Sequence, residues 1–308
     1  MRMETLKGRD FLRVTDWSGD ELLAVLDLAD RLKDERKRYV DEPLLPGRSI
    51  GLLLEKPSLR TRVSFELAVH QLGGHAVHLT GPEVGLGERE STRDVGYVLS
   101  RYLDAIMIRT FAQSTAQELA EHAYVPVVNG LTDETHPCQA LADAMTIRER
   151  LGGFEGVRVA WLGDGNNVCS SLMAMSAKLG MQFMAATPPG YEPTAQALAL
   201  AREAGGEPVV VEDPREAAAG ANVLCTDVWT SMGQEAERDR RRHDLAGHRI
   251  DAEMLALADP DAVVLHCLPA HIGEEITADV LYGPQCAAWD EAENRLHSEK
   301  ALLALVVE

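Results

Sequence analysis

The sequence predicts an α/β protein with two doubly wound parallel-sheet domains. Short apolar runs alternate with amphipathic helical stretches along the 308 residues, as expected for parallel strands joined by crossover helices. The chain is also longer than most single domains. The alternation restarts after two glycines at residues 152–153, so we expect one domain on each side of a helix near this point.

The first series follows an opening helix. Ser18 and Glu21 form a capping box in front of an apolar stripe at helical spacing. The next strand, helix and strand make a βαβ unit, and two more strands follow, each after a helical stretch. The four expected strands span residues 49–55, 75–80, 105–110 and 125–130.

The second series follows a helix expected at residues 136–151, and a last helix is expected at 291–307. We predict a first domain of residues 1–140, with the C-terminal helix 291–308 packing back on it, and a second domain of residues 141–290. Ligands often bind at domain boundaries, so an active-site cleft is expected between the two. The five expected strands of the second domain span residues 157–163, 181–187, 207–213, 222–228 and 262–268.

Composition and charge narrow the class of protein. Apolar residues make up 45% and charged residues 26% of the chain, which is ordinary for a globular protein. No apolar run approaches membrane-spanning length and the charged N-terminus lacks a secretory pattern, so we expect a cytoplasmic protein. The formal net charge of −19 argues against nucleic acid or a membrane surface as a partner. A small anionic substrate stays compatible with it.

The five cysteines are odd in number and include no CxxC pair. This argues against a disulfide framework and against a zinc knuckle. We expect reduced thiols.

The first strand exit carries a candidate anion site. Ligands of open parallel sheets bind beyond the carboxyl ends of the strands, and here residues 56–62 read KPSLRTR and lead into a helix. A helix N-terminus with arginines and hydroxyls suits a phosphate, although two arginines could also merely solvate a helix surface. Residues two apart lie on different helix faces, so we expect Arg60 to reach the anion and Arg62 to form a structural salt bridge.

Polar side chains also follow the third and fourth strands. Arg109 ends the third, and the fourth leads to His136 and Gln139. A lone histidine near a helix start is usually a cap. Because the exits of parallel strands share one sheet edge, however, these groups are expected to converge with Arg60.

In the second domain, GDGNN at residues 163–167 follows a strand and opens a helix. This is the context of a dinucleotide site, but Val168 replaces the third glycine of that motif, which weakens the prediction of NAD binding. Asn166 and Asn167 would suit a carboxylate or simply cap the helix.

The later exits offer further groups. Asp227 and Ser231 could hold an ammonium group, and the charged run at 234–248 is expected to be a solvated helix or loop. Cys267 beside His266 suits a thiolate nucleophile or a metal-ligand pair. Because no other ligand stands at zinc spacing, a metal is disfavoured.

Taken together, the chain resembles the aspartate/ornithine transcarbamoylase family, and DVWTSMG with HCLP is similar to its ornithine-using members. The resemblance implies transfer of the carbamoyl group of carbamoyl phosphate to the δ-amine of L-ornithine, giving L-citrulline and phosphate. It implies no metal or organic cofactor, a homotrimer or multiple of trimers, and a role in arginine metabolism, as in arginine biosynthesis. The motifs that carry it run from residue 56 to 295: KPSLRTRVSFE, IRT, HPCQAL, GDGNN, DVWTSMGQE, HCLPAH and AENR.

The resemblance also implies the site residues. Four would be catalytic, namely Arg109, His136, Asp227 and Cys267, with Cys267 positioning the substrates rather than bonding to them. The ornithine-binding residues would be Asn167, Asp227, Ser231 and Met232. Those that bind carbamoyl phosphate would be Ser58, Leu59, Arg60, Thr61, Arg109, His136, Gln139, Cys267, Leu268 and Arg295.

Two positions depart from the family pattern. Leu59 stands where threonine is common, which leaves a backbone N–H. Gly85 stands where a glutamine often reaches a neighbouring subunit's site, and Arg89 could replace it. The alternatives are a transcarbamoylase for another amine such as putrescine or N-acetylornithine, a nucleotide-dependent dehydrogenase, and a non-catalytic binding protein.

Overall fold

The computed structural model describes residues 6–231 and 233–308, so the predicted ligand residue Met232 lies outside the described residues. The chain divides into two compact units. Unit 1 comprises Met1–Met145 with Glu293–Glu308, and unit 2 comprises Thr146–Ala292. The predicted cleft between domains stays a prediction.

Unit 1 contains a four-stranded parallel sheet in the order β2-β1-β3-β4. This doubly wound order reverses between β1 and β3, and ligands bind at such a switch point. The four expected strands are present, each within two residues of its predicted ends. They are β1 (Ser49–Leu54), β2 (His75–Thr80), β3 (Ala105–Arg109) and β4 (Val127–Leu131).

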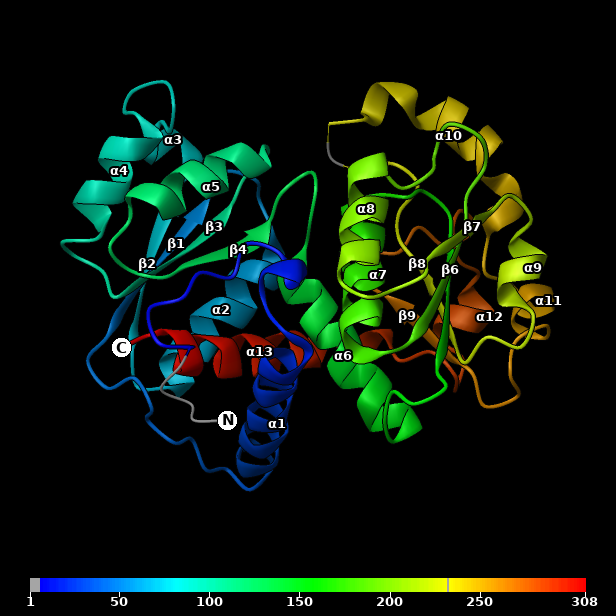
Figure 1. Cartoon of the computed structure of the whole chain (residues 1–308), viewed down its shortest axis with the longest axis horizontal. Coiled ribbons are helices and arrows are strands. Elements are labelled where there is room, and N and C mark those ends of the chain that lie inside the picture. The colour runs from blue at the N-terminus through cyan, green and yellow to red at the C-terminus, as the bar shows by residue number, and fades with distance from the viewer. Residues whose placement is uncertain (1–5, 232) are drawn as a thin grey trace. The chain divides into compact units, whose positions relative to one another are not determined.

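Helices cover both faces of this sheet (Figure 1). One apolar cluster joins Leu53, Ile106 and Ile108 of the strands to Val95 of α4 and Leu119 of α5. The opposite face carries α2 and α13 (Figure 1). The helices of this part of the chain are α1 (Gly19–Lys37), α2 (Leu59–Gln71), α3 (Gly81–Val84), α4 (Thr92–Leu99), α5 (Gln113–His122), α6 (Pro137–Leu151) and α13 (Ala288–Val306), and a short 3-10 helix, η2 (Val14–Asp16), precedes α1.

The opening helix α1 begins as predicted. The Ser18 hydroxyl accepts from the Glu21 N–H at 3.2 Å, and the Ser18 N–H donates to the Glu21 carboxylate at 2.8 Å. These reciprocal bonds satisfy two donors that a helix start otherwise leaves open.

Unit 2 contains a five-stranded parallel sheet in the order β7-β6-β5-β8-β9, whose order reverses between β5 and β8. The five expected strands are again present. They are β5 (Arg158–Leu162), β6 (Gln182–Ala186), β7 (Val209–Val211), β8 (Val223–Thr226) and β9 (Val263–His266). The helices are α7 (Asn167–Leu179), α8 (Ala195–Glu203), α9 (Pro214–Ala218), α10 (Arg238–Asp244), α11 (Ala252–Leu255) and α12 (Ala278–Leu281), with 3-10 helices η3 (Glu235–Glu237) and η4 (Ala246–His248).

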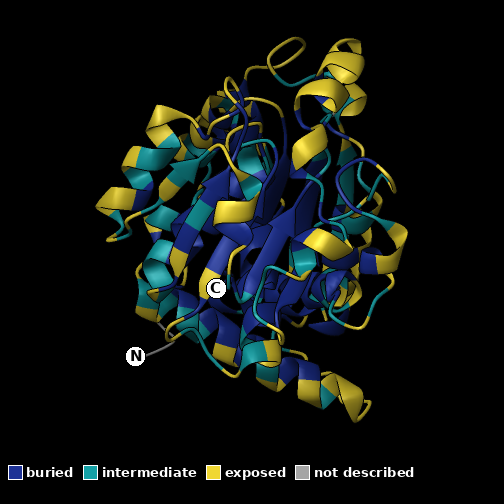
Figure 2. Ribbon diagram, turned by 90° about the vertical axis from the view of Figure 1, so that its right-hand side faces the viewer, coloured by how far each residue is buried: buried dark blue, intermediate teal, exposed yellow. Residues whose placement is uncertain are grey.

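Strand β5 shows why this sheet needs helices on both faces. Val159 and Trp161 pack with residues of α7, whereas Ala160 and Leu162 pack with residues of α9 and α12. Successive side chains of a strand point to opposite faces, and both sets are apolar. The strands in Figure 2 are accordingly mostly dark blue, and exposed residues gather on helices and loops.

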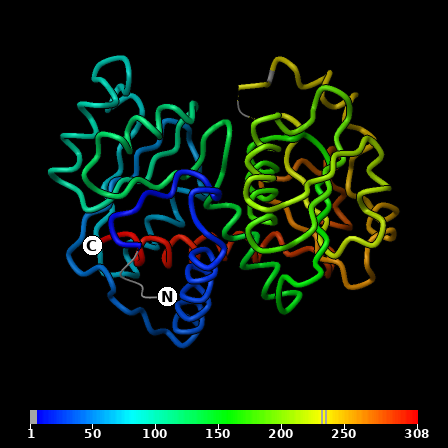
Figure 3. Tube along the Cα trace, viewed as in Figure 1, coloured from blue at the N-terminus to red at the C-terminus, as the bar shows by residue number. Residues whose placement is uncertain are grey.

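The C-terminal helix α13 returns to unit 1, as predicted. The Lys33 ammonium donates to the Asn294 side chain at 2.6 Å, and the Lys300 ammonium donates to the Gln71 side chain at 3.0 Å. Figure 3 shows this red segment lying among the blue segments of the N-terminal half. No helix in the described residues has both the length and the apolarity that a membrane crossing requires.

The expectation of a solvated run at 234–248 is wrong for Arg241. This side chain is buried, forms an ion pair with Asp164 at 2.7 Å and lies 5.0 Å from the ring centre of Tyr191. The charged run forms α10, and helical periodicity turns Arg241 inward while Arg240 stays exposed. Burial raises the pKa of Asp164 to about 6, although Arg241 opposes the rise.

Candidate active site

The candidate anion site of unit 1 starts at the N-terminus of α2, which follows β1. The Ser58 hydroxyl caps the helix by accepting from the Thr61 N–H at 3.3 Å. The Leu59 side chain is 76% exposed, so this residue has mainly a backbone N–H to offer. A capped helix start with outward N–H groups provides positive potential for an anion.

Two arginines meet at the hydroxyl of Thr61. Its oxygen accepts from Arg109 Nη1 at 3.3 Å and from Arg295 Nη2 at 3.2 Å. The three side chains come from β3, α2 and α13, and each is at most 6% exposed. The structure thus brings together two cations that lie far apart in the sequence.

Gln139 and Glu299 hold the guanidinium of Arg295 from two further sides. Arg295 Nη1 donates to Gln139 Oε1 at 2.9 Å, and Nε donates to Glu299 Oε1 at 2.9 Å. The Gln139 amide is itself fixed, because its nitrogen donates to Asp143 at 2.8 Å. Sequence reasoning missed Glu299, whose only signal was its place one helical turn after Arg295.

His136 lies buried beside these cations. Burial lowers its pKa well below the usual histidine value. Arg295, Arg109 and Arg60 lower it further, in that order, by repelling a proton. His136 is therefore neutral at physiological pH, and Arg60 is close enough to contribute to the same field.

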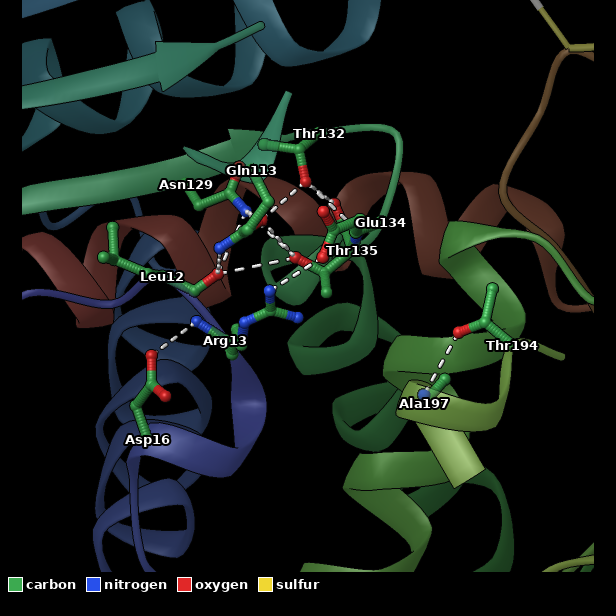
Figure 4. A network of polar contacts seen from close by, with 10 residues as sticks. All are labelled: Leu12, Arg13, Asp16, Gln113, Asn129, Thr132, Glu134, Thr135, Thr194 and Ala197. Carbon is green, nitrogen blue, oxygen red and sulfur yellow. Dashed lines mark hydrogen bonds and ion pairs between the residues drawn. The ribbon is translucent and has the colours of Figure 1, made fainter. Parts of the chain in front are cut away.

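A buried polar network supports the segment that carries His136 (Figure 4). Gln113 Oε1 accepts from the Thr132 hydroxyl at 2.6 Å and from the Thr135 hydroxyl at 3.3 Å. Asn129 Nδ2 donates to the Leu12 carbonyl and to the Thr135 hydroxyl, both at 3.0 Å. These bonds fix the backbone between β4 and α6, and so the position of the histidine.

Other basic residues of this segment are engaged elsewhere. Lys56 is buried, forms an ion pair with Asp133 and lies 4.4 Å from the ring centre of Phe111. Arg62 Nε lies 3.9 Å from the Glu66 carboxylate, and both side chains are largely exposed. This is the geometry predicted for Arg62, and exposed pairs of this kind contribute little to stability.

Gly85 ends α3 with φ +61°, a left-handed conformation that favours glycine. A Cβ at this position would lie 2.7 Å from Cβ of Arg89. Another side chain would therefore require the local backbone to move. Arg89, the residue that could replace the glutamine, donates to the Glu83 carbonyl at 3.3 Å.

In unit 2, Asp227 is the meeting point of three strand exits. Its carboxylate accepts from Asn166 Nδ2 at 2.7 Å, from Cys267 Sγ at 3.0 Å and from the Val228 N–H at 2.7 Å. Asp227 follows β8, Asn166 follows β5 and Cys267 follows β9. The side chain is only 8% exposed. Sequence reasoning missed Asn166 as the residue that orients this carboxylate.

His266 also lies here, and ligand atoms of Asp227, His266 and Cys267 come within 4.8 Å of one another. Both ring nitrogens are already used, however. Nδ1 accepts from the Leu268 N–H at 2.9 Å, and Nε2 lies 3.1 Å from a Glu275 oxygen. The ring thus orders the backbone after Cys267, and a metal would have to displace these bonds.

The GDGNN loop is accounted for by packing and capping. A Cβ on Gly165 would lie 2.3 Å from the Pro193 nitrogen, so this glycine allows the two segments to touch. Asn166 caps α7 by accepting from Val168 and Cys169, and Asn167 is the first helical residue.

The predicted ligand residue Ser231 lies in another loop. The Ser231 N–H donates to the Gln234 side chain at 3.1 Å.

Fold and side-chain contacts together define a two-unit α/β protein that carries a buried arginine cluster in one unit and an oriented carboxylate with a thiol in the other. The chain belongs to the aspartate/ornithine carbamoyltransferase family. Residues 9–149 match its carbamoyl-P binding domain, and residues 155–306 match its Asp/Orn binding domain.

Individual relatives are similar along nearly their whole length. The ornithine carbamoyltransferase of Symbiobacterium thermophilum is 50% identical over 99% of this chain and 100% of its own. That of Acidothermus cellulolyticus is 53% identical over 97% of each chain. The solved structure of ornithine carbamoyltransferase from Pyrococcus furiosus superposes with a TM-score of 0.95 at 46% identity, covering 98% of each chain.

Proposed function

We propose that this protein transfers the carbamoyl group of carbamoyl phosphate to the δ-amine of L-ornithine, giving L-citrulline and phosphate. The observation that carries the proposal is the convergence of Arg109 and Arg295 on Thr61, beside the neutral His136, at a helix N-terminus. The relatives that match the whole chain are named ornithine carbamoyltransferase.

Unit 1 would bind carbamoyl phosphate. The N-terminus of α2 would receive the phosphate, and the groups that meet around Thr61 would receive the carbamoyl end. The proposed ligands in this unit are Ser58, Leu59, Arg60, Thr61, Arg109, His136, Gln139 and Arg295, and the exit of β9 would add Cys267 and Leu268.

The reaction follows from this distribution of charge. The neutral δ-amine attacks the carbonyl carbon, and the carbonyl oxygen gains negative charge as the tetrahedral intermediate forms. Arg109 and His136 donate hydrogen bonds to that oxygen, and Arg60 stabilises the charge that builds on the departing phosphate. The intermediate then collapses by breaking the bond between carbon and phosphate oxygen, and the amine nitrogen gives up one proton to the departing phosphate. No bond to the enzyme is needed.

Unit 2 would bind ornithine. Asp227, held by Asn166 and Cys267, offers a charge for the α-ammonium group, and Ser231 adds a hydroxyl. Asn167 and the backbone of Met232 would receive the α-carboxylate.

The test is a citrulline assay with an amine panel. Purified protein with carbamoyl phosphate should carbamoylate ornithine at least about a hundredfold faster than putrescine, N-acetylornithine or aspartate, because only ornithine presents both α groups and a δ-amine. Equal rates with putrescine would overturn the substrate assignment. A fluorescence change on titration with NADH would favour the dehydrogenase alternative.

We also propose a cytoplasmic homotrimer, or a multiple of trimers, that serves arginine biosynthesis. Leu59, Val63 and Leu67 form an exposed apolar stripe at helical spacing along α2, as a subunit interface requires. Light scattering of the purified protein should give three times the 33.6 kDa mass of one chain, or a multiple of that value, and Leu67→Glu should lower the measured mass. Loss of the protein from its host should cause a requirement for arginine or citrulline.

A further inference from the structure

Glu299 is a buried carboxylate that the proposed reaction does not use. It is 0% exposed on α13, one turn after Arg295. Burying a carboxylate is costly unless it is well partnered. Glu299 also places a negative charge next to Arg295, a cation that is proposed to attract the anionic carbamoyl phosphate. A carboxylate at this position therefore needs a specific explanation.

The contacts of Arg295 indicate that role. Glu299 Oε1 accepts from Nε at 2.9 Å and lies 2.7 Å from Nη2. Two further bonds of the guanidinium go to Gln139 and Thr61, neighbours that are proposed to bind carbamoyl phosphate. Because a guanidinium is planar and rigid, holding its Nε edge fixes the direction of its remaining N–H groups.

The polar groups that face this carboxyl come from three helices. They are Arg295 on α13 itself, Ser64 on α2 and the thiol of Cys138 on α6. Burial raises the pKa of Glu299 to about 7, although Arg295 and Ser64 oppose the rise. Burial and the charge of Glu299 raise the pKa of the Cys138 thiol, so the thiol stays neutral while Glu299 titrates.

We propose that Glu299 is a positioning residue, which orients the Arg295 guanidinium toward carbamoyl phosphate and moderates the positive charge of the anion site. This inference rests on the proposed function. It concerns one substrate only, since every contact involved lies within unit 1.

Steady-state kinetics of Glu299→Ala and Glu299→Gln test the inference. Glu299→Ala should raise the KM for carbamoyl phosphate about tenfold or more, because a charge-assisted bond to Arg295 is lost, and should leave the KM for ornithine nearly unchanged. Glu299→Gln keeps an oxygen acceptor for Arg295 and should stay within about threefold of the wild type at pH 6. Glu293→Gln is the matched control, because Glu293 lies on the same helix with a 52% exposed side chain.

A pH series separates positioning from simple packing. At pH 8 the wild-type carboxyl is ionised and weakens the positive field, so Glu299→Gln should bind carbamoyl phosphate several-fold more tightly than the wild type. At pH 6 the wild-type carboxyl is protonated, and the two proteins should converge. A packing role would give a ratio of KM values that does not change with pH.

Calorimetry with carbamoyl phosphate and with inorganic phosphate separates the two proposals. If the wild type binds neither and makes no citrulline, the proposed function is wrong. If the wild type is active and folded Glu299→Ala has the same KM for carbamoyl phosphate, the positioning role is wrong. Should circular dichroism show that Glu299→Ala is unfolded, the Glu299→Gln series decides, and a pH-independent ratio would overturn the role.

Discussion

Arg295 and Thr61 are 234 residues apart in the sequence, yet Nη2 of Arg295 donates to the Thr61 hydroxyl at 3.2 Å. The C-terminal helix α13 thus places a cation at the start of α2, in the N-terminal half of the chain. Arg109 donates to the same hydroxyl, so one oxygen joins two of the three arginines of the proposed carbamoyl phosphate site.

Arg60 and Arg62 should differ sharply when replaced. Arg60→Ala should lower kcat/KM for carbamoyl phosphate by about a hundredfold or more, because it removes a donor that stabilises developing charge. Arg62→Ala should stay within about twofold, since its exposed pair with Glu66 contributes little. The measurement is the citrulline assay at varied carbamoyl phosphate. Similar losses in the two variants would contradict the division of roles.

Thr61 offers a matched pair of substitutions. Thr61→Val is close in shape but removes the oxygen that accepts from Arg109 and Arg295, whereas Thr61→Ser keeps it. We expect kcat/KM for carbamoyl phosphate to fall about tenfold to a hundredfold in the valine variant and by much less in the serine variant. The hydroxyl would be irrelevant to the site if valine and serine behaved alike.

Cys267 should prove to be a positioning group. Its thiol donates to Asp227 at 3.0 Å, so Cys267→Ala should raise the KM for ornithine and lower kcat by about tenfold, and Cys267→Ser should restore part of the loss. A covalent nucleophile would behave differently, because its removal usually costs about 10⁴-fold or more in kcat. A loss of that size would return Cys267 to the nucleophile hypothesis.

Activity should rise from pH 7 to pH 9. A δ-amine with a lysine-like pKa of about 10.4 is mostly protonated at neutral pH. The fraction of neutral amine, which is the attacking form, therefore rises about tenfold per pH unit. The pKa of His136 is lowered well below its usual value. Titration of His136 therefore does not contribute to the rise in activity between pH 7 and pH 9. The check is kcat/KM for ornithine at saturating carbamoyl phosphate, and a flat profile would exclude amine deprotonation as the limiting event.

Glu299 should make the protein less stable as pH rises. The folded pKa of about 7 exceeds the ordinary value of 4.5, so the folded state holds an extra proton between these values. Stability from this group is therefore full below about pH 4.5 and is lost as pH rises through about 7. At pH 8 Glu299→Gln should exceed the wild type by at most about 3 kcal/mol in free energy of unfolding, and below about pH 4.5 that advantage should vanish. Urea unfolding at a series of pH values measures this difference, with Glu293→Gln as control.

Much of the candidate anion site was predictable, because the carboxyl ends of strands can be located in a sequence. Apolar runs locate the ends of β1, β3 and β4, and parallel pairing brings those ends to one edge. Arg109, His136 and the start of α2 follow from that rule alone. The family resemblance, rather than any local pattern, indicated Arg295.

Other features could not be read from local patterns. Arg241 stands in a run of three arginines, and only the packing of α10 shows that it is the buried one, paired with Asp164. The sequence around Asn166 indicates a helix cap. Its second role, the hydrogen bond to Asp227, depends on the end of β8 lying beside it in the fold. In each case the deciding partner lies more than 60 residues away.

The sequence by itself determined the order of strands and helices, the two α/β units and the family, because hydrophobic periodicity and motif order are local properties. Tertiary structure alone decided the partners of each polar group. It placed Glu299 against Arg295 within a core where a carboxylate is costly and its pKa rises. The energy of a charged group depends on its burial and on its distance from other charges. Residues that are adjacent in the sequence determine neither of these quantities.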